Sequence, residues 1–111
     1  MAKKLVVWLT IDPEQEGTFN DWYQEEYIPR FARQIPGIQA VTRWRIPETT
    51  TYLTVYDLDS NLTMDELNSA LRSPDREADK EAWLEWETAY VTDFSDGFFE
   101  RVFEYRPDSG E

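Results

Sequence analysis

Four stretches of this chain alternate between apolar and polar residues or are rich in β-branched and aromatic side chains, as β-strands are. They are residues 4–11, 38–46, 51–58 and 98–106. The second and third are joined by the short connection 47–50, which predicts a hairpin. Gly97 marks the expected start of the fourth.

Helical signals fill the sequence between these strands. Residues 14–34 place aromatic residues three and four positions apart, which predicts the first helix. Residues 63–66, Thr-Met-Asp-Glu, fit a capping box, and Ser73-Pro74 fits an N-cap followed by proline in the first turn. We therefore expect a second helical region in two parts, the later of which covers about residues 74–91.

The predicted element order is β-α-β-β-α-β, which indicates a ferredoxin-like α+β fold, an antiparallel sheet with helices on one face. We expect residues 1–106 to form this single domain and residues 107–111 to form a polar C-terminal tail. Val6 and Trp8 would point away from the other apolar residues of the first strand, so both faces of the sheet are apolar. Such a sheet needs a second layer on each face. The sequence therefore predicts a homodimer with the sheets face to face.

On the first helix, a carboxylate and a phenol fall within an aromatic stripe that should face the interior. The stripe consists of Phe19, Trp22, Tyr23, Glu26, Tyr27 and Phe31. Pro29 has no amide hydrogen for the carbonyl group of Glu25, so the helix should bend or end nearby. Polar groups on an apolar face beside such a break are what a small pocket requires. A core in which two polar side chains reach solvent would show the same pattern.

The residue types that are absent restrict the chemistry. The 111 residues include no histidine and no cysteine, which removes the commonest transition-metal ligands and the thiol nucleophile. There is also no glycine-rich phosphate-binding loop, so we expect neither a metal nor another cofactor. Proton transfer would need a carboxylate, a tyrosine, a lysine or the substrate itself. Five tryptophans, six tyrosines and six phenylalanines are more than a core this small easily encloses, so some should lie in a subunit interface or a ligand cavity.

The net charge of −12 comes entirely from the second part of the chain. Residues 1–46 hold six basic and six acidic side chains, whereas residues 47–111 hold five basic and seventeen acidic ones. This charge argues against nucleic acids and anionic membranes as partners. No apolar stretch approaches the roughly 20 residues of a membrane span, and the apolar run 5–11 is too short for a secretory signal. We therefore expect a cytoplasmic protein.

Several of these motifs resemble those of one protein family. They are the helix segment 19–29 (FNDWYQEEYIP), the turn Pro36-Gly37-Ile38, the run Arg43-Trp44-Arg45 and the tyrosine-rich strand 52–56. Together they resemble the dimeric α+β barrel superfamily, and within it the EthD-like proteins. The resemblance implies a homodimer that acts on aromatic or polyketide-like substrates by acid–base chemistry, without a metal or an organic cofactor.

Where that family usually has a histidine, this chain has Tyr27. A phenol with a free pKa of about 10 is no base at neutral pH unless its pKa is strongly lowered, but it can donate a hydrogen bond to a carbonyl or enolate oxygen. Glu26 is then the candidate base, because burial on the aromatic face would raise its pKa. Alternatively, Glu26 pairs with Arg43 or Arg45 and only balances charge.

The remaining candidate residues would bind the ligand. Trp22, Tyr23 and Tyr56 would form the walls of the pocket, although aromatic stripes at helical spacing also form ordinary cores. Arg43 would hold an anionic substrate or, alternatively, lie at the surface near the subunit boundary.

The sequence therefore supports three functions. The first is a cofactor-independent enzyme, such as a lyase, cyclase or oxygenase, for a small aromatic or polyketide-like molecule held between the first helix and the sheet. The second is a non-catalytic binding or accessory protein for such a ligand. The third is a structural homodimer whose own aromatic side chains fill the same space and leave no cavity.

Overall fold

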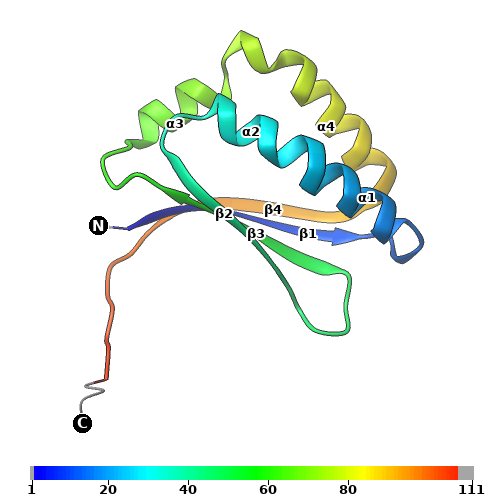
Figure 1. Cartoon of the computed structure of the whole chain (residues 1–111), viewed down its shortest axis with the longest axis horizontal. Coiled ribbons are helices and arrows are strands. Elements are labelled where there is room, and N and C mark those ends of the chain that lie inside the picture. Colours follow the sequence, from blue (N-terminus) through cyan, green and yellow to red (C-terminus); the bar gives the residue numbers. More distant parts are fainter. Residues whose placement is uncertain (1, 108–111) are drawn as a thin grey trace.

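The computed structural model of the protein describes residues 2–107, in which one antiparallel sheet carries helices on one face (Figure 1). The strands are β1 (Lys3–Ile11), β2 (Ile38–Arg45), β3 (Thr51–Leu58) and β4 (Val91–Glu100). The helical elements are η1 (Pro13–Gln15), α1 (Glu16–Trp22), η2 (Tyr23–Tyr27), α2 (Ile28–Gln34), α3 (Met64–Leu71), η3 (Pro74–Arg76) and α4 (Glu77–Tyr90). This arrangement confirms the predicted ferredoxin-like α+β fold.

The strand order is β2-β3-β1-β4, and every neighbouring pair is antiparallel. β1 lies inside the sheet, which suits a strand with apolar side chains on both faces. Leu5, Leu9 and Ile11 of β1 point toward the helices and are buried. Thr54 and Tyr56 of β3 are buried on the same face.

Two groups of buried side chains fill the space between the helices and the sheet. One surrounds Phe31 of α2 and Tyr56 of β3, and the other surrounds Phe19 of α1 and Leu9 of β1. Tyr27 and Val7 pack against both groups and therefore lie at the boundary between them.

The later helices begin where their capping residues predicted. The backbone N–H of Glu66 donates to Thr63 Oγ1 (3.1 Å), and the backbone N–H of Thr63 donates to Glu66 Oε1 (2.9 Å), which completes the capping box of α3. The backbone N–H of Asp75 donates to Ser73 Oγ (3.2 Å) at the start of η3. These side chains satisfy N–H groups that have no partner within the helix.

The last strand differs from the prediction at both ends. β4 begins at Val91, directly after α4, and ends at Glu100, whereas the predicted strand covered residues 98–106. Aspartate, serine and glycine, which occupy positions 93 and 95–97 of β4, are rare in strands, but antiparallel pairing along the whole of β1 outweighs this low propensity. Residues 101–107 have no regular secondary structure, and residues 108–111 of the predicted tail lie outside the described residues.

The second face of the sheet has no helical cover within residues 2–107 (Figure 1). Trp8 and Trp44 lie on this face with 40% and 62% of their surface exposed, and Phe99 packs edge-on against Trp8 with ring centroids 6.3 Å apart. We call this surface the open sheet face. Within the same residues, no helix combines the length and the apolar character that crossing a membrane requires.

Candidate functional site

A π-helical turn interrupts the long helix that carries the predicted site residues. It consists of Tyr23–Tyr27, and the backbone N–H of Ile28 donates to the carbonyl group of Tyr23, five residues earlier. Pro29 follows in the first turn of α2. In a regular α-helix its ring would clash with the carbonyl group of Glu25, and a wider turn relieves that contact. The break predicted near Pro29 is therefore present as a π-helical turn.

This turn aligns four aromatic residues on the face toward the sheet. Phe19, Tyr23, Tyr27 and Phe31 follow one another in steps of four residues, and in a helix with 3.6 residues per turn each step rotates the side chain by about 40°. The wider turn takes back part of that rotation. Successive rings lie 5.2, 5.6 and 5.9 Å apart between centroids.

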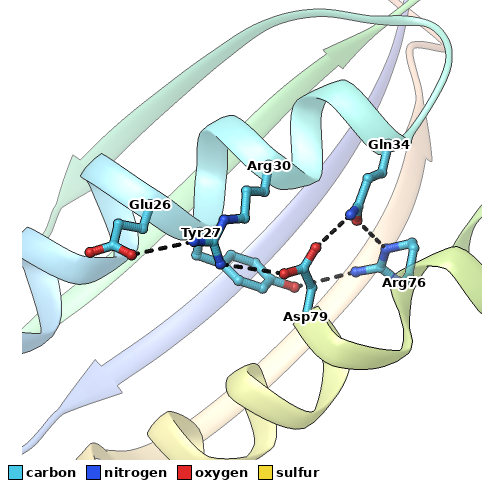
Figure 2. Close-up of polar contacts among 6 residues, drawn as sticks. All are labelled: Glu26, Tyr27, Arg30, Gln34, Arg76 and Asp79. Atoms are coloured by element: carbon cyan, nitrogen blue, oxygen red, sulfur yellow. Dashed lines mark hydrogen bonds and ion pairs between the residues drawn. The ribbon is translucent and has the colours of Figure 1, made fainter.

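Glu26 lies on the outer side of this helix, so its predicted position on the interior aromatic face is wrong. Its side chain is 57% exposed, and its Oε1 accepts from Arg30 Nη2 at 3.5 Å (Figure 2). The π-helical turn that keeps Tyr27 inside rotates Glu26 away. Its ion-pair partner is Arg30 and not the alternative partners Arg43 or Arg45. A role for Glu26 as a base stays a prediction.

A cavity of about 200 Å³ lies between the helices and the sheet, where the sequence predicted a pocket. It is lined by Leu5, Val7, Tyr23, Tyr27, Phe31, Tyr56, Leu71, Arg76, Lys80, Trp83, Phe94 and Asp96. The lining is aromatic or aliphatic except for the charged groups of Arg76, Lys80 and Asp96. The third function considered from the sequence, a structural homodimer whose own aromatic side chains fill this space, predicts no cavity here and is therefore inconsistent with the structure.

Three phenols in the lining are protonated at neutral pH. Burial raises the pKa of Tyr27 to about 12, although the nearby Arg76 acts to lower it. Burial also raises the pKa of Tyr23 and of Tyr56. These hydroxyl groups therefore act as hydrogen-bond donors and acceptors and not as bases.

Arg76 brings a buried guanidinium group to the same cavity. Its Nε donates to Gln34 Oε1 (3.2 Å) and its Nη2 to Tyr27 Oη (3.5 Å) (Figure 2). Its Nη1 donates to the carbonyl group of Leu71 (2.9 Å). The guanidinium carbon also lies 4.9 Å from the centre of the Phe31 ring. Only 5% of Arg76 is exposed.

Arg43 lies outside the cavity lining, between two aromatic rings. Its guanidinium carbon is 4.8 Å from the centre of the Tyr23 ring and 4.4 Å from that of Tyr52. Its Nη1 donates to Asn20 Oδ1 (2.7 Å) and to Gln24 Oε1 (3.1 Å). Burial lowers its pKa. These contacts tie α1 and the π-helical turn to β2 and β3.

The predicted wall residues divide into two groups. Tyr23 and Tyr56 line the cavity together with Tyr27. Trp22 instead stacks on Trp86 of α4, with parallel rings 4.4 Å apart between centroids. The structure therefore brings the tyrosines together and leaves Trp22 in the packing between α1 and α4.

The sequence analysis missed the charged lining residues. Arg76 and Lys80 are four positions apart, and Trp83 follows three positions later, which is the spacing of one helix face. Asp96 alternates with Phe94 along β4, but the predicted strand began beyond both. The spacing of Arg76, Lys80 and Trp83 therefore indicated a shared helix face. The position of Asp96 could be predicted only with the correct start of β4.

No group of three carboxylates is placed to hold a metal ion in the part of the chain that the structure describes. The arrangement offers hydrogen-bond donors, a cation and aromatic surface to a ligand, without an evident metal site.

The fold is similar to that of several solved structures. SnoaB, a cofactor-independent oxygenase from Streptomyces nogalater, superposes with a TM-score of 0.68 at 21% identity, covering 96% of this chain and 98% of that chain. An EthD (ethyl tert-butyl ether D) family protein from Bacillus halodurans gives 0.62 at 20% identity, covering 92% and 100%. An antibiotic biosynthesis monooxygenase gives 0.66 at 14% identity, covering 90% and 98%.

This chain has the fold of these proteins. The EthD family protein among them confirms the resemblance that the sequence motifs predicted, at the level of the fold. No family model matches the sequence, and neither does any curated protein.

Proposed function

We propose that the protein binds a small aromatic molecule in the cavity between the helices and the sheet. The observation that carries this proposal is the cavity itself, about 200 Å³ with mostly aromatic and aliphatic walls. An apolar cavity of about 150 Å³ in another protein binds benzene, so this space matches one ring with one or two substituents. Of the predicted ligand class, we therefore propose the one-ring aromatic members and not fused polyketide-like rings.

In the catalytic form of the proposal, the protein activates this ligand by proton transfer without a cofactor. Tyr27 Oη and Arg76 Nη2 lie 3.5 Å apart and line the cavity together. Donors of this kind stabilise negative charge that develops on a substrate oxygen. Asp96 lines the cavity and Glu26 does not, so we propose Asp96 as the proton acceptor, with Glu26 as the alternative.

Two of the similar structures support an oxygenase among the predicted cofactor-independent reactions. SnoaB is a cofactor-independent oxygenase, and another of the structures is an antibiotic biosynthesis monooxygenase. An oxygenase would use dioxygen as its second substrate. We therefore propose this reaction class ahead of a lyase or a cyclase.

A non-catalytic binding protein is the second candidate, and a specific observation favours it. The buried donors Tyr27 and Arg76 have no carboxylate at contact distance in residues 2–107, and the exposed Glu26 pairs with Arg30 on the surface. Donors with no carboxylate at contact distance bind a ligand more readily than they assist its deprotonation.

We also propose that the protein is a homodimer that buries the open sheet face. Trp8, Trp44 and Phe99 form an exposed apolar surface on a sheet whose other face is covered. Large exposed apolar surfaces of this kind mark interaction sites. The expectation that nucleic acids and membranes are not partners stays a prediction.

A screen of one-ring and three-ring aromatic compounds for thermal stabilisation tests the proposed function. A compound present at 100 times its Kd adds about 2.7 kcal/mol to the free energy of unfolding, and we expect this from one-ring compounds alone. Stabilisation by none of them would contradict the proposal. Oxygen uptake by chelator-treated protein with a bound compound would then show that the protein is a cofactor-independent oxygenase. Binding without turnover would show that it is a non-catalytic binding protein.

A further inference from the structure

The positive charge of Arg76 has no partner carboxylate at contact distance within residues 2–107. The atoms that accept its hydrogen bonds, on Gln34, Leu71 and Tyr27, are neutral oxygens. None of the ion pairs between described residues includes Arg76. Burying a cation without a paired anion is unfavourable in free energy. Binding of an anion from outside the chain would therefore stabilise the buried guanidinium group.

Gln34 separates Arg76 from Asp79. The Gln34 side chain accepts from Arg76 Nε at 3.2 Å with its oxygen and donates to Asp79 Oδ2 with its nitrogen (Figure 2). Asp79 also accepts from Arg30 Nη1 at 3.5 Å. The carboxylate of Asp79 is therefore engaged by Arg30 and Gln34, and it does not contact Arg76.

Arg76 and Tyr27 together present unused donors at the cavity wall. A guanidinium group has five N–H donors, and three of them have partners among the described residues. The contact with Tyr27 is 3.5 Å long, at the weak limit of a hydrogen bond. When the Tyr27 hydroxyl accepts from Arg76, its own proton remains free to be donated. Both residues line the cavity.

We propose that these donors bind the carboxylate of a one-ring aromatic acid. A carboxylate matches the planar fork of a guanidinium group and supplies the missing negative charge. The ring of the acid would then lie against Tyr56 and Trp83, which line the same cavity. This inference rests on the proposed function and narrows its ligand to an anion.

Two other charged groups in the lining bear on this choice. Lys80 adds a second positive charge, and Asp96 is exposed on β4. The buried charge of the cavity is therefore positive, although the chain as a whole carries −12. A neutral aromatic ligand would leave that buried charge unpaired.

A purely structural role for Arg76 leads to a different expectation. Arg76 binds the last residue of α3, Leu71, and lies over the ring of Phe31. If Arg76 had only these structural contacts and no role in binding, replacing it would lower the stability of the protein without changing the preference of the cavity for charged over neutral ligands.

Benzoate and benzamide provide the test, because they have nearly the same shape and differ in charge. In calorimetric titrations of the wild-type protein, we expect benzoate to bind at least about tenfold more tightly, as expected for charge-assisted hydrogen bonds. Arg76→Gln should abolish this preference and leave the Kd for benzamide within about threefold. Arg72→Gln, which changes an exposed arginine just after α3, is the matched control and should keep the full preference.

The outcomes separate this inference from the proposed function. Equal affinity of the wild-type protein for both compounds, or an undiminished preference in Arg76→Gln, would overturn the carboxylate site while aromatic binding stands. Binding of no aromatic compound at all would contradict the proposed function. If Arg76→Gln does not fold, Arg76→Lys decides: it keeps the charge but loses the fork, so it should weaken benzoate binding several-fold and benzamide binding little.

Discussion

Neighbouring residues of the π-helical turn, Glu26 and Tyr27, have opposite surroundings. Glu26 is exposed, whereas Tyr27 lines the cavity and contacts Arg76. We expect Glu26→Gln to change stability by less than about 0.5 kcal/mol and to leave ligand binding unchanged. We expect Tyr27→Phe to weaken ligand binding and, in an enzyme, to lower turnover by about 10²–10³ through loss of one donor.

Titration calorimetry and turnover assays on these two near-isosteric variants check this prediction, with chemical unfolding as the measure of stability. If Glu26 were the base despite its exposure, Glu26→Gln would be the more severe change. Wild-type behaviour of Tyr27→Phe would remove Tyr27 from the site.

Because its phenols are buried, the free energy of unfolding of the protein should depend on pH in the alkaline range. Burial raises the pKa of Tyr27 to about 12 in the folded protein, against about 10 in the unfolded chain. Between these values the unfolded state releases a proton that the folded state keeps, so stability is full below about pH 10 and falls as the pH rises toward 12. Burial of Tyr23 and Tyr56 acts in the same direction.

Urea unfolding at several pH values between about 8 and about 11 measures this fall. The free energy of unfolding of Tyr27→Phe should decline less steeply with pH than that of the wild-type protein, because the variant lacks one of the buried phenols that lose a proton on unfolding. Stability that rises over this range would show that the phenols are not buried as described.

At the scale of elements, local signals predicted the fold well. The third strand was predicted at residues 51–58 and is β3 with the same bounds, and α3 begins directly after its predicted N-cap, Thr63. The alternating pattern of β3 and the capping box of α3 each involve only a few neighbouring residues, so they can be recognised in the sequence. β4 was predicted poorly because residues 93–97 have the composition of a loop, and their pairing partners on β1 lie 83 to 91 positions earlier in the chain.

The candidate site was predicted only where it depends on local pattern. Tyr23, Tyr27 and Tyr56 line the cavity as expected. Glu26 was misplaced because the prediction assumed a regular helix through residues 23–27, where the structure has a π-helical turn. Arg76 was missed although its spacing from Lys80 and Trp83 indicated a shared helix face, because its burial depends on the contacts between η3 and α2.

The π-helical turn itself leads to a prediction about deletions. Removing Glu25 should convert the turn into a regular helix that keeps Tyr23 and Tyr27 on one face, three positions apart. Pro29 would then clash with a helical carbonyl group, which costs about 3 kcal/mol. Thermal and urea unfolding should show that Pro29→Ala restores much of the stability lost in the Glu25 deletion. A double variant no more stable than the deletion alone would contradict this account of the turn.

At the scale of the whole molecule, the open sheet face predicts a homodimer. We expect sedimentation to give twice the chain mass of 13.2 kDa and an interface above about 1,500 Å². Trp44→Lys should dissociate the dimer, because Trp44 lies on the open sheet face and is 62% exposed in the single chain. Leu84→Lys, at an equally exposed position on α4, is the control and should remain dimeric. A stable wild-type monomer at micromolar concentration would contradict the dimer.

The central claim is that the cavity between the helices and the sheet holds an aromatic ligand, and a cavity-filling variant tests it most directly. Val7→Phe adds a ring to the wall of the cavity, whereas Val102→Phe adds the same ring at a position that is 88% exposed. Calorimetric titration with the best one-ring compound should show binding to the wild-type protein and to Val102→Phe, and loss of binding in folded Val7→Phe. Unchanged affinity in Val7→Phe would place the ligand elsewhere and contradict the account.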